Sequence, residues 1–194
     1  AGRNHPLSGG ARRRPLAGMS QDATDTITLL NRALAQDFRV MPLFTPQLPV
    51  FLAVAVPTAE GVTGLKPRLP AGRGMTLQQA MIAAGAEAVE LRASLAQRHG
   101  AELAALPRDG GFATVAAQDM LGGADVAVPA QEVYLDGAAL LSEPLICDAN
   151  STGCAAGQTR ADAIRAGLWE CVERDAVALW WHGGLPAGPL PLDL

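Results

Sequence analysis

The sequence predicts a mixed α/β fold of duplicated strand-and-helix units, in which two long helices pack against an antiparallel or mixed sheet. Two observations lead to this prediction. Residues 76–98 and 159–181 both have helical character behind a capping threonine, and their residues match at one fixed offset. Short apolar runs bounded by glycine and proline, which are typical of strands, lie before and between these two segments.

The N-terminal part is predicted to contain one helix. Residues 1–21 are rich in Gly, Arg and Pro and have no period, which predicts a flexible lead-in before the folded part. Over residues 22–38, apolar side chains recur at helical spacing behind several polar residues suited to a cap. Pro42, Pro46 and Pro49 then interrupt regular structure.

A strand and the first long helix are expected next. The apolar run Val50–Val56 is rich in strand-forming residues and predicts a buried strand. A Gly/Pro-rich connection covers residues 57–74. The helix is expected to begin at Thr76 and to end at about Arg98, because Gly100 follows.

The region after the first long helix is predicted to hold short strands and a second long helix. The strand candidates are residues 112–116, 126–128 and 132–135. The segment Ala138–Cys147 is compatible with either a strand or a loop. The second long helix is expected from about Thr159 to Trp181, closed by Gly183 and Gly184.

The two long helices match each other at an offset of 83 residues (159 − 76). Both begin Gly-x-Thr, and both carry a polar side chain three residues after the threonine, Gln79 or Asp162, suited to a capping box. The further coincidences are Ala80 with Ala163, Ala83 with Ala166, Glu87 with Glu170, Val89 with Val172, and Glu90 with Glu173. The two Glu-x-x-Glu pairs at one distance from a capped start indicate a duplicated unit.

The spacing of the paired glutamates has a chemical consequence. Residues i and i+3 share a helix face with Cβ atoms about 5–6 Å apart, so each pair places two carboxylates together. Alanine and glycine around both pairs allow close helix packing. Four facing carboxylates would suit a hard cation, above all Mg²⁺ carrying nucleotide phosphates. A solvated helix face and a di-metal hydrolase site are the alternatives, although the latter lacks suitably placed histidines.

Composition excludes several classes of protein. The net charge of −4 argues against a nucleic-acid surface. The longest apolar stretch is too short to span a bilayer, and the first residues do not resemble a signal peptide, so a cytoplasmic protein without a membrane partner is expected. Cys147, Cys154 and Cys171 are too scattered for a disulfide framework or a zinc site, so reduced thiols are expected.

Five segments resemble motifs of the YcaO family. Residues 72–74 and 83–91 are similar to its Gly-Lys-Gly start and its SxxxExxER helix. Residues 128–135, VPAQEVYL, resemble its VPAxxVYL strand. Residues 151–158, STGCAAGQ, resemble its SNGLAAGN motif, and residues 170–175, ECVERD, its ExxERD helix.

The resemblance implies an ATP- and Mg²⁺-binding fold without a P-loop, and this chain has no GxxxxGK[ST] sequence. The residues that it implies for Mg²⁺ are Glu87, Glu90, Asp162 and Glu173. Those that it implies for the nucleotide are Arg73, Gln158, Glu170 and Arg174. No catalytic residue is assigned. The chain departs from the family pattern at Ala83, Leu91, Gln158 and Asp162, where the family has Ser, Arg, Asn and Glu, and Arg73 replaces a lysine.

The function implied is that of a bacterial, cytoplasmic YcaO-type cyclodehydratase that modifies ribosomally made peptides. Such an enzyme uses ATP to activate peptide backbone amides and forms azolines or thioamides. Residues 22–194 are expected to be the N-terminal half of such a domain, truncated at its C-terminal end. The expected partners are a precursor peptide and a leader-binding protein or domain, and a homodimer stays open. The alternative is a catalytically degenerate scaffold or peptide-binding module.

Overall fold

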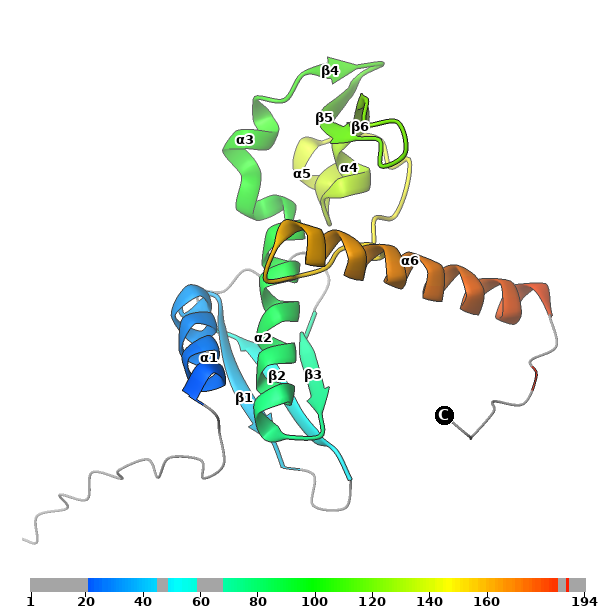
Figure 1. The fold of residues 1–194 in the computed structure, drawn as a ribbon. Helices are drawn as coiled ribbons and strands as arrows, with labels where there is room; N and C mark the ends of the chain where they lie inside the picture. Colours follow the sequence, from blue (N-terminus) through cyan, green and yellow to red (C-terminus); the bar gives the residue numbers. More distant parts are fainter. Residues whose placement is uncertain (1–20, 45–48, 59–67, 185–187, 189–194) are drawn as a thin grey trace, which may run out of the picture.

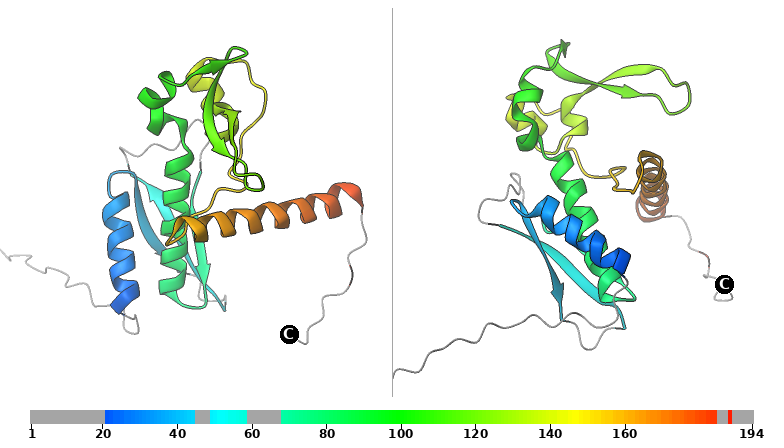
Figure 2. Two further views of the ribbon diagram at one scale, coloured as in Figure 1. Left: turned by 45° about the horizontal axis from the view of Figure 1, so that its top comes forward. Right: turned by 60° about the vertical axis from the view of Figure 1, so that its left-hand side comes forward.

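A computed structural model describes residues 21–44, 49–58, 68–184 and 188. Two helices lie on one face of a three-stranded antiparallel sheet with the order β1-β2-β3 (Figures 1 and 2). These elements are α1 (Gln21–Leu34), β1 (Phe38–Leu43), β2 (Phe51–Pro57), β3 (Ala71–Gly74) and α2 (Leu77–Ser94). The mixed α/β class and the antiparallel sheet are confirmed. The lead-in predicted for residues 1–21 lies, except for Gln21, outside the described residues.

Small side chains let α2 lie directly on the sheet. Ala80, Ala84 and Ala88 are four residues apart on α2 and are fully buried. A Cβ atom built on Gly72 of β3 would lie 2.2 Å from the backbone nitrogen of Ala84. The helix and the strand therefore meet backbone to backbone, and their contact requires glycine at this point. Larger side chains, including Leu34, Phe38 and Leu95, complete the core around this contact.

The predicted helix over residues 22–38 is too long, because it ends at Leu34 and β1 begins at Phe38. Phe38 and Val40 are buried on either side of an exposed residue, which is the period of a strand. Pro42 is tolerated within β1 because β1 is an edge strand of this sheet.

Strand β3 was not predicted, since it falls within the connection expected over residues 57–74. It has only four residues, two of them glycine, and so lacks an apolar run. Pairing with β2 defines it, through the partners Phe51↔Gly74 and Leu52↔Arg73. The strand predicted at Val50–Val56 is confirmed as β2.

A second group of elements follows α2 and contains another three-stranded antiparallel sheet, β4-β5-β6 (Figure 1). Its members are η1 (Ala96–His99), α3 (Gly100–Ala104), β4 (Arg108–Asp109), β5 (Phe112–Gln118), β6 (Asp125–Pro129), α4 (Ala130–Val133) and α5 (Gly137–Leu141). The strands predicted at 112–116 and 126–128 are confirmed. Helix α2 ends at Ser94, before the predicted Arg98, and Gly100 begins α3 instead of ending α2.

The strand predicted over residues 132–135 is wrong, because a single helical turn, α4, covers its first two residues. Leu135 then forms an isolated parallel bridge with Leu95. The backbone N–H of Leu135 donates to Ser94 O, and that of Ala96 donates to Leu135 O. The segment Ala138–Cys147, left open between strand and loop, begins as helix α5.

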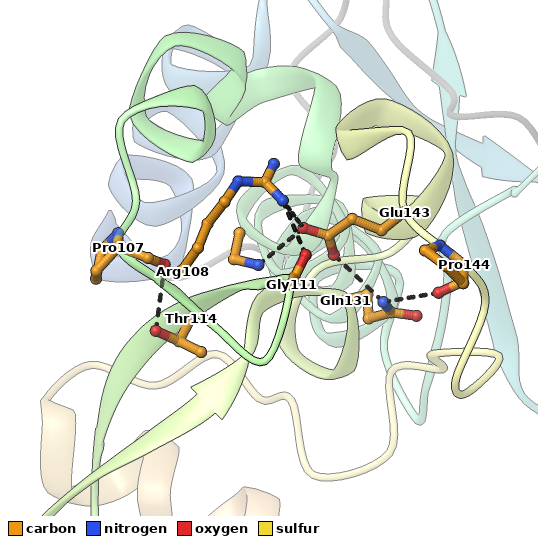
Figure 3. Close-up of polar contacts among 8 residues, drawn as sticks. Pro107, Arg108, Gly111, Thr114, Gln131, Glu143 and Pro144 are labelled. Atoms are coloured by element: carbon orange, nitrogen blue, oxygen red, sulfur yellow. Dashed lines mark hydrogen bonds and ion pairs between the residues drawn. The ribbon is translucent and has the colours of Figure 1, made fainter.

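A buried carboxylate joins the second sheet to the chain that leaves α5 (Figure 3). The side chain of Glu143 is only 2% exposed and accepts hydrogen bonds from Arg108 Nη1 at 3.0 Å and from the Ala113 backbone N–H at 2.8 Å. Gln131 Nε2 donates to its other oxygen at 3.3 Å. Because a buried charge is costly without such partners, Glu143 holds the β4–β5 hairpin and α4 together.

We expect Glu143→Ala to lower the free energy of unfolding by about 3 kcal/mol, because it leaves the buried Ala113 N–H without its acceptor and removes bonds from Arg108 and Gln131. Chemical denaturation at neutral pH measures the change. Glu132→Ala, at an exposed position on α4, is the control and should stay within about 0.5 kcal/mol of the wild type. Equal losses in both variants would contradict the role given to Glu143.

The second long helix, α6 (Arg160–Gly183), confirms the predicted segment and extends away from both sheets (Figures 1 and 2). It ends at Gly184, which has a left-handed backbone conformation (φ 63°), as a glycine C-cap predicts. Gly167 is its one buried residue within the described part of the chain. None of the described helices combines the length and the apolarity that crossing a membrane requires.

Candidate functional site

The starts of α2 and α6 have the same local structure, as their matching sequences predict. Thr76 (φ −128°, ψ 152°) and Thr159 (φ −128°, ψ 161°) are both extended N-caps. Their hydroxyl oxygens accept the backbone N–H of Gln79 and of Asp162, each at 3.1 Å. In α2 the Gln79 side chain also accepts the Thr76 N–H, which completes a capping box.

The glycines before the two caps are also equivalent. A Cβ atom on Gly74 would lie 2.4 Å from Gln79 Cβ and 2.9 Å from the backbone nitrogen of Ala80. A Cβ atom on Gly157 would lie 2.5 Å from the backbone nitrogen of Ala163. Each helix therefore folds its first turn over the chain that leads into it, and in both places only glycine fits.

The first glutamate of each pair ties its helix to the preceding segment. Glu87 Oε2 accepts the backbone N–H of Ala71 at 3.1 Å, and Glu170 Oε2 accepts that of Gly153 at 3.1 Å. These acceptors are 83 residues apart (170 − 87), and their donors are 82 apart (153 − 71). The duplication thus includes the anchoring of both carboxylates; the second oxygen of Glu170 also accepts from Arg174 Nε at 3.2 Å.

Glu90 lies where the two helices bring their carboxylates together. Burial, then the charge of Glu170, then that of Glu87 raise its pKa from 4.5 to about 7. Three carboxylates from α2 and α6 therefore act on one another electrostatically. The ion pair from Arg174 to Glu170, at 3.2 Å, only partly offsets this negative charge.

The carboxylates open into two pockets. The first, of about 450 Å³, is lined by Arg68, Glu87, Glu90, Asp148, Asn150, Ser151 and the apolar Leu69, Pro70, Leu91, Leu135 and Ala149. The second, of about 590 Å³, is lined by Glu170, Glu173, Arg174, Val177, Ala178, Trp181 and His182. The predicted site residues are thus divided, with the first pair facing one pocket and the second pair the other.

Two other predicted residues occupy the start of α6. Gln158 is exposed directly before the Thr159 cap. The Asp162 carboxylate accepts the Thr159 hydroxyl at 2.7 Å and pairs with Arg165 at 2.6 Å. The Thr159 hydroxyl, followed by the Arg165 charge, lowers the pKa of Asp162. Asp162 is therefore negatively charged and already bound to Thr159 and Arg165.

Arg73 does not join the carboxylates in this structure. Gly72 and Gly74 face α2, so the side chain between them points to the opposite face of the sheet. Arg68, which sequence reasoning missed, lines the first pocket instead and pairs with Asp136 at 3.3 Å. No sequence signal identifies Arg68, because it stands in a Gly/Pro-rich connection.

The protein family follows from comparison with known proteins. Residues 96–194, half of the chain, match the family model described as YcaO cyclodehydratase, ATP- and Mg²⁺-binding. The chain belongs to the YcaO family. The YcaO-like fold expected from the motifs is thereby confirmed, and a search of curated proteins gave no match.

Solved structures agree on the YcaO fold. The chain superposes on YcaO from Methanopyrus kandleri bound with AMPPCP and Mg²⁺ with a TM-score of 0.64 and 20% identity, over 84% of this chain and 45% of that one. A heterocyclase in complex with substrate and cofactor gives a TM-score of 0.67 and 20% identity, over 88% and 30% of the two chains. The E. coli microcin synthetase McbBCD complex gives 0.50 and 18%, over 74% and 41%. The chain thus spans less than half the length of these YcaO-like structures.

One departure from the YcaO pattern changes the first pocket. Leu91 occupies the position that corresponds to Arg174 at the same offset (174 − 83). Its side chain is 7% exposed, belongs to the core around α2 and forms part of the pocket wall. Glu87 therefore lacks the intrahelical arginine partner that Glu170 has, and negative charge dominates this side of the site.

The carboxylate oxygens of Glu87, Glu90 and Glu170 suit a cation that is also bound by phosphate oxygens. Mg²⁺ typically keeps several waters and binds one or two protein carboxylates together with substrate phosphates. Within the described ranges, no three His, Cys, Asp or Glu side chains are close enough to hold an ion by themselves. The mutual repulsion at Glu90 nevertheless provides the uncompensated negative charge that a cation would neutralise.

The raised pKa of Glu90 predicts a pH-dependent stability without metal or nucleotide. Between pH 4.5 and about 7 the folded protein holds a proton at Glu90 that the unfolded chain has released. Raising the pH through this window therefore lowers the free energy of unfolding, and the loss is complete above about 7. After discounting for solvent screening, we expect an effect on the order of 1 kcal/mol.

Glu90→Gln removes this titration. The variant should be more stable than the wild type at pH 8, and the difference should shrink towards zero near pH 4.5. Urea denaturation of both proteins at several pH values measures the difference. A constant difference across this range would contradict the electrostatic origin of the effect.

Proposed function

We propose that this chain contributes the ATP- and Mg²⁺-binding carboxylates of a YcaO enzyme that activates peptide backbone amides. The observation that carries the proposal is the electrostatic interaction among Glu87, Glu90 and Glu170 of the two matched helices. The charges of Glu87 and Glu170 raise the pKa of Glu90. Membership of the YcaO family supports it. The chain spans less than half the length of the solved structures that it resembles.

The proposed reaction is the cyclodehydration of a precursor peptide. A Cys, Ser or Thr side chain of the substrate adds to the carbonyl carbon of the neighbouring amide, and the γ-phosphoryl group of ATP passes to the former carbonyl oxygen. Loss of that oxygen as phosphate, together with a proton from nitrogen, leaves the azoline ring and ADP. An external sulfide in place of the side chain would give a thioamide.

Each described carboxylate has a defined part in this proposal. Glu87 and Glu170 are fixed by their bonds to Ala71 and Gly153; the second oxygen of Glu87 is oriented for a cation, while that of Glu170 also accepts from Arg174. Glu90, whose pKa both of these charges raise, would ionise fully when a cation offsets its neighbours. Bound Mg²⁺ would neutralise charge on the nucleotide phosphates. Glu173 and Asp162 are proposed to contribute from the α6 side, while Gln158 and Arg174 contact the nucleotide.

The phosphates also require a cation from the protein. Arg73 was expected to supply it, but Arg68 lines the same pocket as Glu87 and Glu90. We therefore propose Arg68 as the arginine nearer to the phosphates. A guanidinium group can donate two parallel hydrogen bonds to phosphate oxygens. A leader-binding partner protein or domain is proposed to deliver the precursor peptide.

Calorimetric titration with AMPPCP, with and without Mg²⁺, tests the proposal. We expect binding that requires Mg²⁺, is weakened about tenfold in Arg68→Gln and is nearly unchanged in Arg73→Gln. Asp136→Asn is the control for the lost ion pair, since it removes the negative charge that pairs with Arg68 but keeps the guanidinium. Absence of binding in the wild type would reject the claim that this chain forms the nucleotide site and would favour a scaffold or peptide-binding role.

A further inference from the structure

Two cysteines meet where the loop before α6 touches that helix. The position that a Cβ atom on Gly153 would take lies 2.9 Å from Cys171 Sγ, so the Cys171 side chain packs directly on the Gly153 backbone. Cys154 is the next residue in the loop, and its backbone N–H donates to Ser151 O at 2.9 Å. Cys171 is also one of the groups that raise the pKa of Cys154, after burial, Glu90 and Glu170. The two thiols are therefore neighbours in space.

The backbone holds this loop against α6 independently of the thiols. Gly153 has φ +85°, and its N–H donates to Glu170 Oε2. A Cβ atom on Gly167 would lie 2.4 Å from Gly153 O, so the loop backbone rests on the helix backbone. Because Gly167 and Glu170, which both precede Cys171 on α6, hold Gly153 in place, the adjacent Cys154 stays within reach of Cys171.

We propose that Cys154 and Cys171 form an oxidation site, at which a peroxide converts the two thiols into an intramolecular disulfide. Consecutive Cα atoms are about 3.8 Å apart, which places the Cys154 Cα near the Gly153 position that Cys171 already touches. A disulfide needs Cα atoms about 4.4–6.8 Å apart, a distance compatible with this packing.

The chemistry requires only the two thiols and the peroxide. Cys171 is the exposed partner, so its thiolate attacks one peroxide oxygen, the O–O bond breaks and the departing hydroxide leaves as water. The sulfenic acid formed at Cys171 is then attacked by the Cys154 thiolate, which expels a second water and forms the S–S bond. The two thiols lose two electrons and two protons, and one peroxide becomes two waters.

The disulfide would act on the proposed nucleotide site through Glu170. The bond would fix Gly153 to α6 beside the carboxylate that accepts its N–H. Cys147 has a different contact, because its Sγ donates to Gln131 O at 3.7 Å. It therefore provides an internal control within the same chain.

The test treats the folded full chain with hydrogen peroxide, blocks the remaining thiols with iodoacetamide and identifies linked tryptic peptides by mass spectrometry. Cys154 and Cys147 share the peptide 109–160, whereas Cys171 lies on the peptide 166–174. We expect these two peptides to be linked in the wild type and in Cys147→Ser. The link should be absent from Cys154→Ser and Cys171→Ser and should disappear on reduction with dithiothreitol.

Any of three results would overturn the proposal. One is full alkylation of Cys154 and Cys171 after peroxide treatment of protein that circular dichroism shows to be folded. Another is a link that persists in Cys154→Ser, since it would place the bond at Cys147. The third is a link found only between two chains. The experiment uses no nucleotide, so its outcome is independent of the proposed function.

Discussion

The double variant Glu90→Gln/Glu170→Gln is expected to lose Mg²⁺-dependent nucleotide binding. Glutamine keeps an oxygen that accepts the Gly153 N–H from position 170, so the loop and α6 stay joined while both charges disappear. Without these charges, a cation bridging carboxylates and phosphates loses two of its proposed carboxylate ligands. We expect the Kd for AMPPCP in the presence of Mg²⁺ to rise about 100-fold, which corresponds to about 2.7 kcal/mol.

Titration calorimetry of the variant beside the wild type measures this loss. Glu102→Gln is the charge control, because Glu102 is an exposed glutamate of α3 outside both pockets. It should bind as the wild type does. Undiminished binding in the double variant would place the nucleotide somewhere other than between α2 and α6.

The variant Gly72→Ala is expected to disrupt the first strand-and-helix unit. Its methyl group would lie 2.2 Å from Ala84 N and 2.3 Å from Ala80 O, both backbone atoms that cannot turn aside. Helix α2 would have to move away from β3, which opens the core formed by the buried alanines of that helix. We expect a loss of about 3 kcal/mol, or a Tm lower by about 6–12 °C.

Gly100→Ala is the matched control for this change. Gly100 begins α3 with a helical backbone (φ −51°), and an added Cβ meets no atom within 4 Å. Alanine there should be neutral or slightly stabilising. A Tm for Gly72→Ala close to that of Gly100→Ala in a thermal melt would show that α2 does not lie on β3 as described.

The local sequence was sufficient to predict an element wherever the contacts that form it join residues close together in the chain. The caps at Thr76 and Thr159, the glycine end of α6 at Gly184 and the apolar strand β2 each depend on side chains within a few residues. The repeat at one offset identified the duplicated helix starts for the same reason. These features needed no knowledge of the rest of the fold.

Strands β1 and β3 could not be found in this way. Neither has a distinctive run of residues, and pairing with β2 defines both. Likewise, the segment before Tyr134 has strand-forming residues but closes one helical turn after Pro129, and only Leu135 returns to an extended bridge with Leu95. Non-local hydrogen bonds decided these elements against their local preference.

The candidate site shows the same difference between features set by local sequence and features set by distant contacts. The sequence by itself determined the matched carboxylates at Glu87, Glu90 and Glu170 and the family to which they belong. Only the tertiary structure decided that Arg73 faces away from them and that Arg68 lines their pocket. The reason is physical: helix periodicity places residues on a face through local geometry, whereas the direction of a strand side chain and the charge around Glu90 depend on segments distant in sequence.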